Sequence, residues 1–134
     1  MADPLPAVYV GFGCRKGCPA DDLEALLQQG LASLGLPVQA LQGIASIDLK
    51  ANETGLHELA ASLQLPLRFF CAEQLQRFAP QLSRRSATAF AHSGCWGVAE
   101  STALALAAHT HGSARLVLTR LTLAGATLAL ASAG

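Results

Sequence analysis

The residues with the clearest capacity for chemistry lie in a glycine-rich stretch near the start of the chain. Residues 11 to 17 read GFGCRKG, so two adjacent cations stand among three glycines. Glycines leave backbone N–H groups open to an approaching anion, and positive charge beside them strengthens the attraction. The stretch therefore predicts an anion-binding turn; the alternative is a tight turn whose glycines serve only the backbone and whose cations are solvated. Its candidate ligand-binding residues are Gly11, Gly13, Cys14, Arg15 and Lys16.

A second turn of the same kind occupies residues 93 to 97, which read SGCWG. Gly94 and Gly97 would again present N–H donors to a ligand. Trp96 would either stack on a flat ligand or belong to the core, because tryptophan serves both purposes. We include Gly94, Trp96 and Gly97 among the ligand-binding candidates.

Two glutamates are the candidate catalytic acids or bases. Glu100 is the lone acid in an alanine-rich, otherwise apolar segment, where it would either exchange a proton with a ligand or only complement a helix dipole. Glu53 lies three residues after Lys50, so the two form either an exposed pair at a helix start or part of a site. Lys50 is the expected ion partner of Glu100 and a candidate ligand-binding residue.

The cysteines and histidines give only weak indications of a nucleophile or a metal site. Cys14 stands beside Arg15, which favours the thiolate form of a nucleophile, but no histidine is marked as its base. The four cysteines are irregularly spaced, which favours reduced thiols in a cytoplasmic protein. His109 and His111, even with His92, do not make an assured ligand set, so we predict no metal site and no cofactor.

Length and composition narrow the functional classes. A chain of 134 residues is long enough for one domain with a real core, which we place over residues 1–134. Only 13% of residues are charged, and nine basic side chains balance nine acidic ones. A neutral surface with few charges does not attract a nucleic-acid backbone, which binds to a basic face. The same scarcity of charge favours self-association, so we expect a homo-oligomer. No targeting segment is evident, and the uncharged apolar stretch over 121–134 is shorter than the ~20 residues that span a bilayer, so no membrane partner is expected.

The first half of the chain predicts alternating strands and helices that would position these residues. Residues 7–12 predict a buried strand, and a helix follows in which Asp21 and Glu24 form a capping box. The apolar residues of 38–49 fit neither the helical nor the strand period, and this segment predicts a short strand or turn leading into a short helix. A further helix, capped by Asn52, carries a leucine-rich stripe for burial.

The second half predicts further elements of both kinds. They are a strand over 67–71, a short helix over 72–78, a mobile surface loop over 80–91, a buried helix over 98–109 and a hairpin of 114–121 with 122–130. The fold class is therefore α/β: a single three-layer α/β/α domain with a mixed sheet closed by a C-terminal antiparallel hairpin. Both glycine-rich turns fall where strands lead into helices, which is where open α/β sheets collect ligands.

Five motifs, in order along almost the whole chain, resemble the CobE/CbiG C-terminal-domain family of cobalamin biosynthesis. They are residues 11–17, 45–56, 67–70, 97–103 and 125–129. A lysine that the family often carries in the first strand of the closing hairpin corresponds to Arg120 here, which keeps the charge and changes the contact geometry. Because the preceding CbiG domains are absent, the chain is most similar to free-standing members of the aerobic pathway.

The resemblance implies a role in building the corrin ring, a macrocycle with many acetate and propionate carboxylates. It first implies that the chain binds or carries a precorrin or corrinoid intermediate, with Arg15, Lys16 and Lys50 on the carboxylates. One alternative is a hydrolase or isomerase acting on a precorrin intermediate, with Glu100 or Glu53 as acid or base. Another is a non-catalytic organiser of neighbouring pathway enzymes. The first two require both glycine-rich turns, Lys50 and Glu100 to converge on one pocket.

Overall fold

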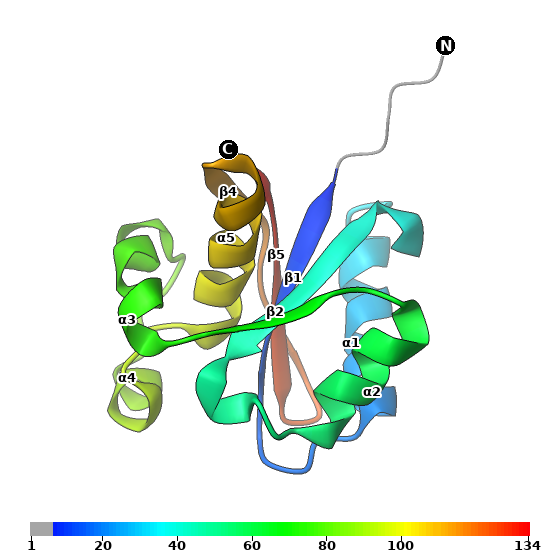
Figure 1. The fold of residues 1–134 in the computed structure, drawn as a ribbon, viewed down its shortest axis with the longest axis horizontal. Helices are drawn as coiled ribbons and strands as arrows, with labels where there is room; N and C mark the ends of the chain where they lie inside the picture. Colours follow the sequence, from blue (N-terminus) through cyan, green and yellow to red (C-terminus); the bar gives the residue numbers. More distant parts are fainter. Residues whose placement is uncertain (1–6) are drawn as a thin grey trace.

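The computed structural model describes residues 7–134, in which strands and helices alternate (Figure 1). The strands are β1 (Val8–Cys14), β2 (Leu41–Ile47), β3 (Leu67–Phe70), β4 (Ala114–Leu123) and β5 (Ala126–Ala133). The α-helices are α1 (Ala20–Ser33), α2 (Thr54–Leu63), α3 (Ala72–Leu75), α4 (Ala87–Ser93) and α5 (Val98–His111). The 3-10 helices are η1 (Val38–Ala40), η2 (Asp48–Lys50) and η3 (Gln76–Gln81). None of the helices in this part of the chain has the length and apolar character needed to cross a membrane.

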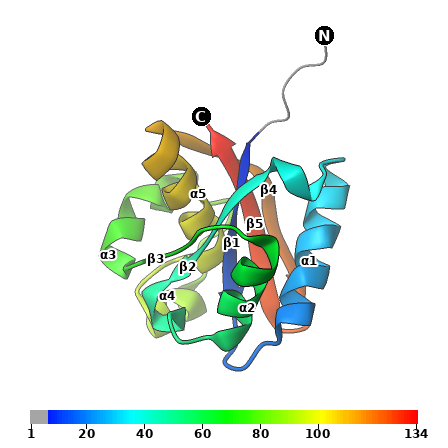
Figure 2. The same ribbon diagram turned by 45° about the vertical axis from the view of Figure 1, so that its right-hand side comes forward.

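The strands form one mixed, open sheet in the order β3-β2-β1-β5-β4. β1, β2 and β3 run parallel, whereas β5 runs antiparallel to both β1 and β4. α1 and α2 cover one face of the sheet, and α3 and α5 cover the other (Figure 1 and Figure 2). The predicted three-layer α/β architecture with a mixed sheet is confirmed. The C-terminal hairpin forms one side of this sheet without closing it, because β3 and β4 remain edge strands.

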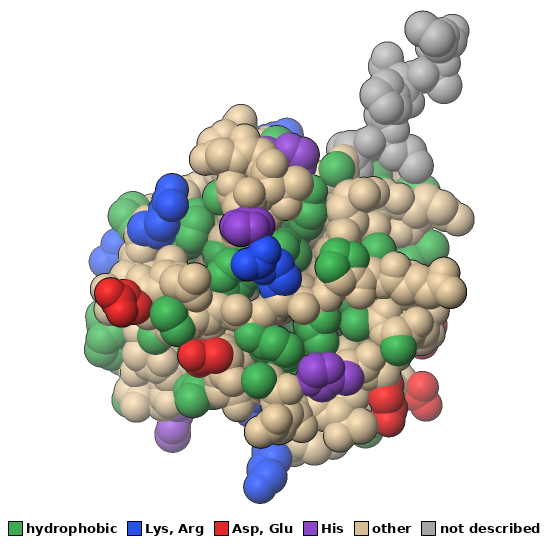
Figure 3. All heavy atoms as spheres, viewed as in Figure 1, with side chains coloured by type: hydrophobic (Ala, Val, Ile, Leu, Met, Phe, Trp, Pro, Cys, Tyr) green, Lys and Arg blue, Asp and Glu red, His purple; other side chains and the backbone are tan. Residues whose placement is uncertain are grey.

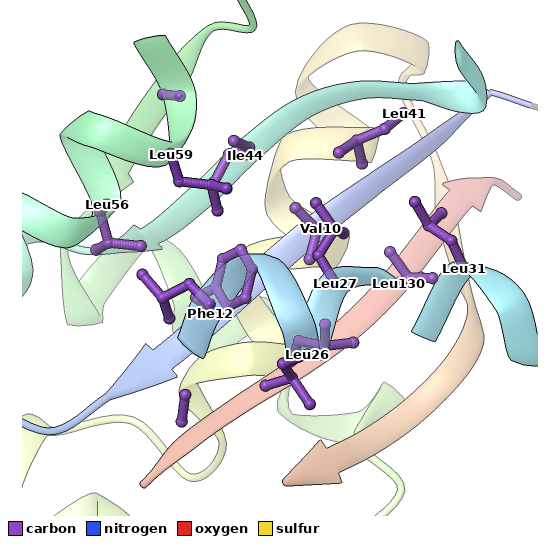
Figure 4. Packing of buried hydrophobic residues seen from close by; sticks show 14 of the residues in the cluster. Val10, Phe12, Leu26, Leu27, Leu31, Leu41, Ile44, Leu56, Leu59 and Leu130 are labelled. Carbon is purple, nitrogen blue, oxygen red and sulfur yellow. The ribbon is translucent and has the colours of Figure 1, made fainter. Parts of the chain in front are cut away.

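Alternation along β1 contributes to the core on both faces of the sheet, because successive strand residues point to opposite sides. Val10 and Phe12 are fully buried and pack with Leu26 and Leu27 of α1 on one face (Figure 4). Burial of each such side chain stabilises the fold by about 1.5–3 kcal/mol. On the other face, the absence of a side chain at Gly11 lets α5 approach the strand.

The close contact between β1 and α5 has a specific cause. Every residue from Ala99 to Ala107 is buried, because this part of α5 is covered by the sheet on one side and by α3 and η3 on another. A Cβ atom on Gly11 would lie 2.1 Å from the backbone oxygen of Ala99, which no packed structure tolerates. Gly11 therefore places the start of α5 beside the end of β1.

The C-terminal hairpin turns at two residues with positive φ. Ala124 has φ 54° and Gly125 has φ 81°, the pattern of a two-residue turn whose twist matches that of the strands. The predicted hairpin is confirmed, but its boundary differs. β4 continues to Leu123, so Thr122, which we predicted in the second strand, belongs to the first.

Two predicted helix caps are wrong. α1 begins at Ala20, so Asp21 lies inside its first turn, where its charge complements the helix dipole instead of capping the end. The N-cap position of α2 is held by Glu53, one residue after Asn52. Neither helix has a side-chain hydrogen bond from its N-cap residue.

The predicted mobile loop over 80–91 is largely helical. Residues up to Gln81 belong to η3, and α4 begins at Ala87. Ser86 caps α4, since its Oγ accepts a hydrogen bond from the N–H of Ala89 at 3.1 Å. Because α4 buries none of its own residues, it has no apolar stripe from which the sequence would reveal a helix.

Candidate functional site

A groove lies at the end of the sheet at which β1 and β2 finish. Figure 1 shows these strand ends in its lower half. It consists of two adjoining pockets of about 530 and 260 Å³, which share Gly13, Ala89 and Val98. The turn between β4 and β5 lies at the same end, because Cys14 pairs with Ala126. The groove is thus bounded by the end of β1, η2, α4, the start of α5 and the C-terminal hairpin.

The charges that line the groove are of one sign. Arg15 comes from the loop after β1, Lys50 from η2 and Arg120 from β4. Within residues 7–134, no aspartate or glutamate lines either pocket, and His92 of α4 adds an imidazole. The small and apolar part of the wall includes Ile47, Leu49, Ala89 and Val98. Positive charge beside apolar surface suits a ligand that carries carboxylates on an apolar body.

The loop after β1 is held at both ends by hydrogen bonds. The N–H of Arg15 donates to the carbonyl of Gly125 at 3.2 Å, and the Arg15 side chain lies directly over this glycine. The N–H of Gly17, which has φ 79°, donates to Oε2 of Glu53 at 2.9 Å. Glu53 therefore supports the loop, and its carboxylate does not line the groove.

Lys16 and Glu53 belong to a different pocket. This pocket, of about 460 Å³, shares no lining residue with the groove and is also lined by Asp21 and Glu58. Acidic side chains outnumber cations here, so the pocket is electrostatically opposite to the groove. The predicted cation pair of Arg15 and Lys16 is thus divided between two sites.

Cys14 lines the groove, but its environment does not favour a thiolate. Burial raises the pKa of the Cys14 thiol from 9.0 to about 11, although Lys50 partly opposes the shift. Cys18 and Glu53 raise it further. The loss of water outweighs the positive charge of Lys50, so the thiolate form that a nucleophile requires is disfavoured at Cys14.

The second glycine-rich turn joins α4 to α5. Gly94 has φ 75° and ends α4, whereas Gly97 is the N-cap of α5 and lines the smaller pocket. Trp96 stacks on Phe90 with ring centroids 4.3 Å apart and an interplanar angle of 21°. One face of the indole is therefore already covered by a residue of this chain. The turn fixes where α5 begins, and α4 forms part of the groove wall.

Glu100 is fully buried and is hydrogen-bonded by two other segments. Its carboxylate accepts from the N–H of Ser83 at 2.9 Å, from the Ser83 hydroxyl and from the N–H of Arg120 at 3.3 Å. β4 is irregular between Leu118 and Leu121, so Glu100 satisfies an N–H in an interrupted part of the ladder. These contacts differ from the expected ion pair with Lys50.

The structure brings part of the predicted site together. The predicted residues that line the groove are Gly13, Cys14, Arg15, Lys50 and Gly97. Those that lie outside its lining are Gly11, Lys16, Glu53, Gly94, Trp96 and Glu100. Arg120 was not among the predicted site residues, although its correspondence to a family lysine of the same charge was the signal that could have added it.

Comparison with known proteins identifies the family. The family model described as cobalamin synthesis G C-terminus matches residues 8–131. The chain belongs to this family. It is thus a protein of cobalamin biosynthesis, and the resemblance read from its five motifs is confirmed.

Some relatives with this cobalamin synthesis G C-terminal domain are similar in length to this chain, and others are much longer. The crystal structure of CobE, a protein from the cobalamin (vitamin B12) biosynthetic pathway, superposes with a TM-score of 0.89 at 40% identity, over 96% of this chain and 93% of that one. Protein CobE of Sinorhizobium sp is 35% identical over 92% of this chain and 79% of its own length. The cobalt-precorrin-5A hydrolase of Priestia megaterium is 28% identical over 71% of this chain, a region that makes up 25% of that protein.

Proposed function

We propose that this cobalamin-biosynthesis domain binds a precorrin or corrinoid intermediate in the groove, with Arg15, Lys50 and Arg120 on its carboxylates. The main support for the proposal is that the groove is lined by cations although the chain as a whole is neutral. The chain has nine basic and nine acidic residues, yet three cations and no described acid line the groove. Hydrogen bonds between such cations and carboxylates are roughly twice as strong as neutral ones.

The size of the groove limits how much of a macrocycle it can hold. Its larger pocket, of about 530 Å³, is within the size range of ligand sites but smaller than a corrin ring with its side chains. The ring would therefore insert one edge, with its apolar body against Ile47, Leu49 and Val98. The first N–H groups of α5, which have no partner within the helix, lie beside Gly97 and would assist an acceptor on the ligand.

The environment of Glu100 supports binding over acid–base catalysis. All three of its hydrogen-bond partners are donors from the protein, and the carboxylate does not line the groove. Its role in this proposal is to fix the backbone at Arg120 and at Ser83, a few residues before α4. Glu100 is thus a positioning residue for one of the carboxylate-binding cations.

A titration with hydrogenobyrinic acid, followed through its absorption bands, tests the proposal. We expect saturable binding, which Arg15→Gln, Lys50→Gln and Arg120→Gln should each weaken about tenfold because each removes a charge-assisted contact. Arg115→Gln is the matched control, since Arg115 is exposed on the same strand as Arg120 and does not line the groove. Absence of any spectral change, or an equal loss in the Arg115 variant, would contradict the proposal.

A hydrolytic function is the second candidate, and the named activity of longer relatives favours it. The cobalt-precorrin-5A hydrolase of Priestia megaterium contains a region similar to this chain. Incubation with cobalt-precorrin-5A and assay of acetaldehyde release tests whether the domain alone turns over. If it does, Glu53→Gln or Glu100→Gln should abolish product formation in a chain that remains folded. If wild type forms no product but binds pigment, binding alone is supported.

A further inference from the structure

A further pocket, separate from the groove, lies between β3, the α3–η3 segment and α5. Its volume is about 250 Å³, and it shares no lining residue with either pocket of the groove. The floor is apolar and consists mainly of the buried rings of Phe70 and Phe78 and the methyl group of Ala105. An aromatic floor of this kind accommodates a small apolar or planar group.

Two basic side chains line this pocket, Arg77 of η3 and His109 of α5, and Arg68 of β3 contacts His109 from outside the lining. Nη1 of Arg68 lies 2.7 Å from Nε2 of His109, and the guanidinium carbon is 5.6 Å from the ring centroid of Phe70. The guanidinium carbon of Arg77 is 5.0 Å from the ring centroid of Phe78. In Figure 3, blue Lys or Arg atoms adjoin purple histidine atoms near the centre of the face that is drawn. The Arg68 guanidinium therefore covers part of the Phe70 ring, and the Arg77 guanidinium covers part of the Phe78 ring.

The hydrogen bonds already formed by these side chains determine which of their donors and acceptors remain free for a ligand. Arginine has no acceptor, so Nε2 of His109 accepts from Arg68, and the imidazole keeps a proton on Nδ1 as a donor. Oε1 of Gln74 already accepts from the N–H of Cys71 at 2.8 Å, which leaves its amide NH₂ group. Arg77 only donates. The polar groups at this rim thus present donors to a ligand, and the complement of a donor rim is an anion.

We propose that this pocket binds a small organic carboxylate. Its carboxylate would accept from Arg77 and from the Arg68–His109 pair. Its apolar body would lie against Ala105, Ala108 and the parts of the two aromatic rings that the guanidinium groups leave uncovered. Arginine suits this role because its planar fork matches a carboxylate. The pocket is too small for a macrocycle, so this ligand differs from that of the groove, and the proposal stands independently of pigment binding.

Titration of the ¹⁵N-labelled full chain by NMR tests the site with three probes. Sodium benzoate should cause saturable shifts of the backbone amides of Gln74, Arg77 and His109, whereas the neutral benzamide should not. Equal shifts with benzamide would show that charge is not recognised and would overturn the proposal. Inorganic phosphate that binds as tightly as benzoate would overturn the requirement for an apolar body. Absence of saturable shifts with benzoate would overturn the site itself.

Two variants and a matched control locate the binding. Arg68→Gln and Arg77→Gln should each weaken benzoate binding about tenfold, because each removes a charge-assisted donor. Arg85→Gln, which removes an exposed arginine that does not line this pocket, should change it by less than about twofold. Equal weakening in the Arg85 variant would show general electrostatic attraction and would overturn the site. Unchanged amide shifts outside the pocket report that each variant is folded.

Discussion

Glu100 is a buried carboxylate that accepts from three donors, two on Ser83 and one on Arg120. Glu100→Gln would place an NH₂ group where one carboxylate oxygen now accepts, so at least one donor loses its partner. We expect the free energy of unfolding to fall by about 2 kcal/mol, measured by urea denaturation. Glu58→Gln, which changes an exposed carboxylate on α2, should alter it by less than ~0.5 kcal/mol. Equal stability of the Glu100 variant and wild type would contradict this role.

The reactivity of the Cys14 thiol should depend on pH in a way that its burial determines. Burial raises its pKa from 9.0 to about 11, so the rate of alkylation of Cys14 by iodoacetamide should keep rising with pH and level off only above about pH 11. Because the unfolded chain loses this proton first, the contribution of the thiol to stability is complete below pH 9.0 and is lost as the pH rises toward 11. Peptide mass spectrometry after timed alkylation measures the profile. Lys50→Gln should slow the reaction further, and an inflection below pH 9.0 in wild type would contradict the prediction.

Between elements, the contact of β1 with α5 is sensitive to a single methyl group. In Gly11→Ala the new Cβ would lie 2.1 Å from the backbone oxygen of Ala99, so the strand and the helix must separate. We expect a loss of about 3 kcal/mol in the free energy of unfolding, measured by urea denaturation. Gly13→Ala is the matched control, because its Cβ would meet Val98 at an ordinary 3.7 Å. A Gly11 variant as stable as the Gly13 variant would show that the helix start is not fixed by this contact.

Elements with a buried face were predictable from the sequence, and elements without one were not. The apolar run of β1, the leucine stripe of α1 and the turn of the C-terminal hairpin each carry a local pattern that burial enforces. Residues 38–49 formed the expected strand and short helix as β2 and η2, but their edges were ambiguous because β2 is buried on both faces and shows no alternation. α4 was missed because a capped helix of seven residues with no buried side chain leaves no periodic signal.

At the scale of the whole molecule, the topology of the sheet made it predictable that segments distant in the sequence meet at the groove. Parallel strands finish at the same end of a sheet, so the loop after β1 and Lys50 after β2 were expected to meet, and both line the groove. The partner of Glu100 was not predictable, because it depends on an irregularity in β4 and on a segment before α4 that lacks a pattern. Side-chain pairing between elements is thus the part that the sequence alone left open.

The scarcity of charge on the molecule leads to a prediction about salt. On the face shown in Figure 3, basic and acidic side chains are scattered among hydrophobic and neutral atoms, and the formal net charge is zero. Attraction of a polycarboxylate therefore depends on the cations of the groove, and salt should screen it. Raising NaCl from about 0.05 M to about 0.5 M should weaken binding of hydrogenobyrinic acid by about threefold to tenfold, measured by isothermal titration calorimetry. Arg15→Gln and Lys50→Gln should each make this dependence shallower, whereas Arg115→Gln should keep the wild-type slope. If the slope is the same in all four proteins, the cations of the groove do not hold carboxylates.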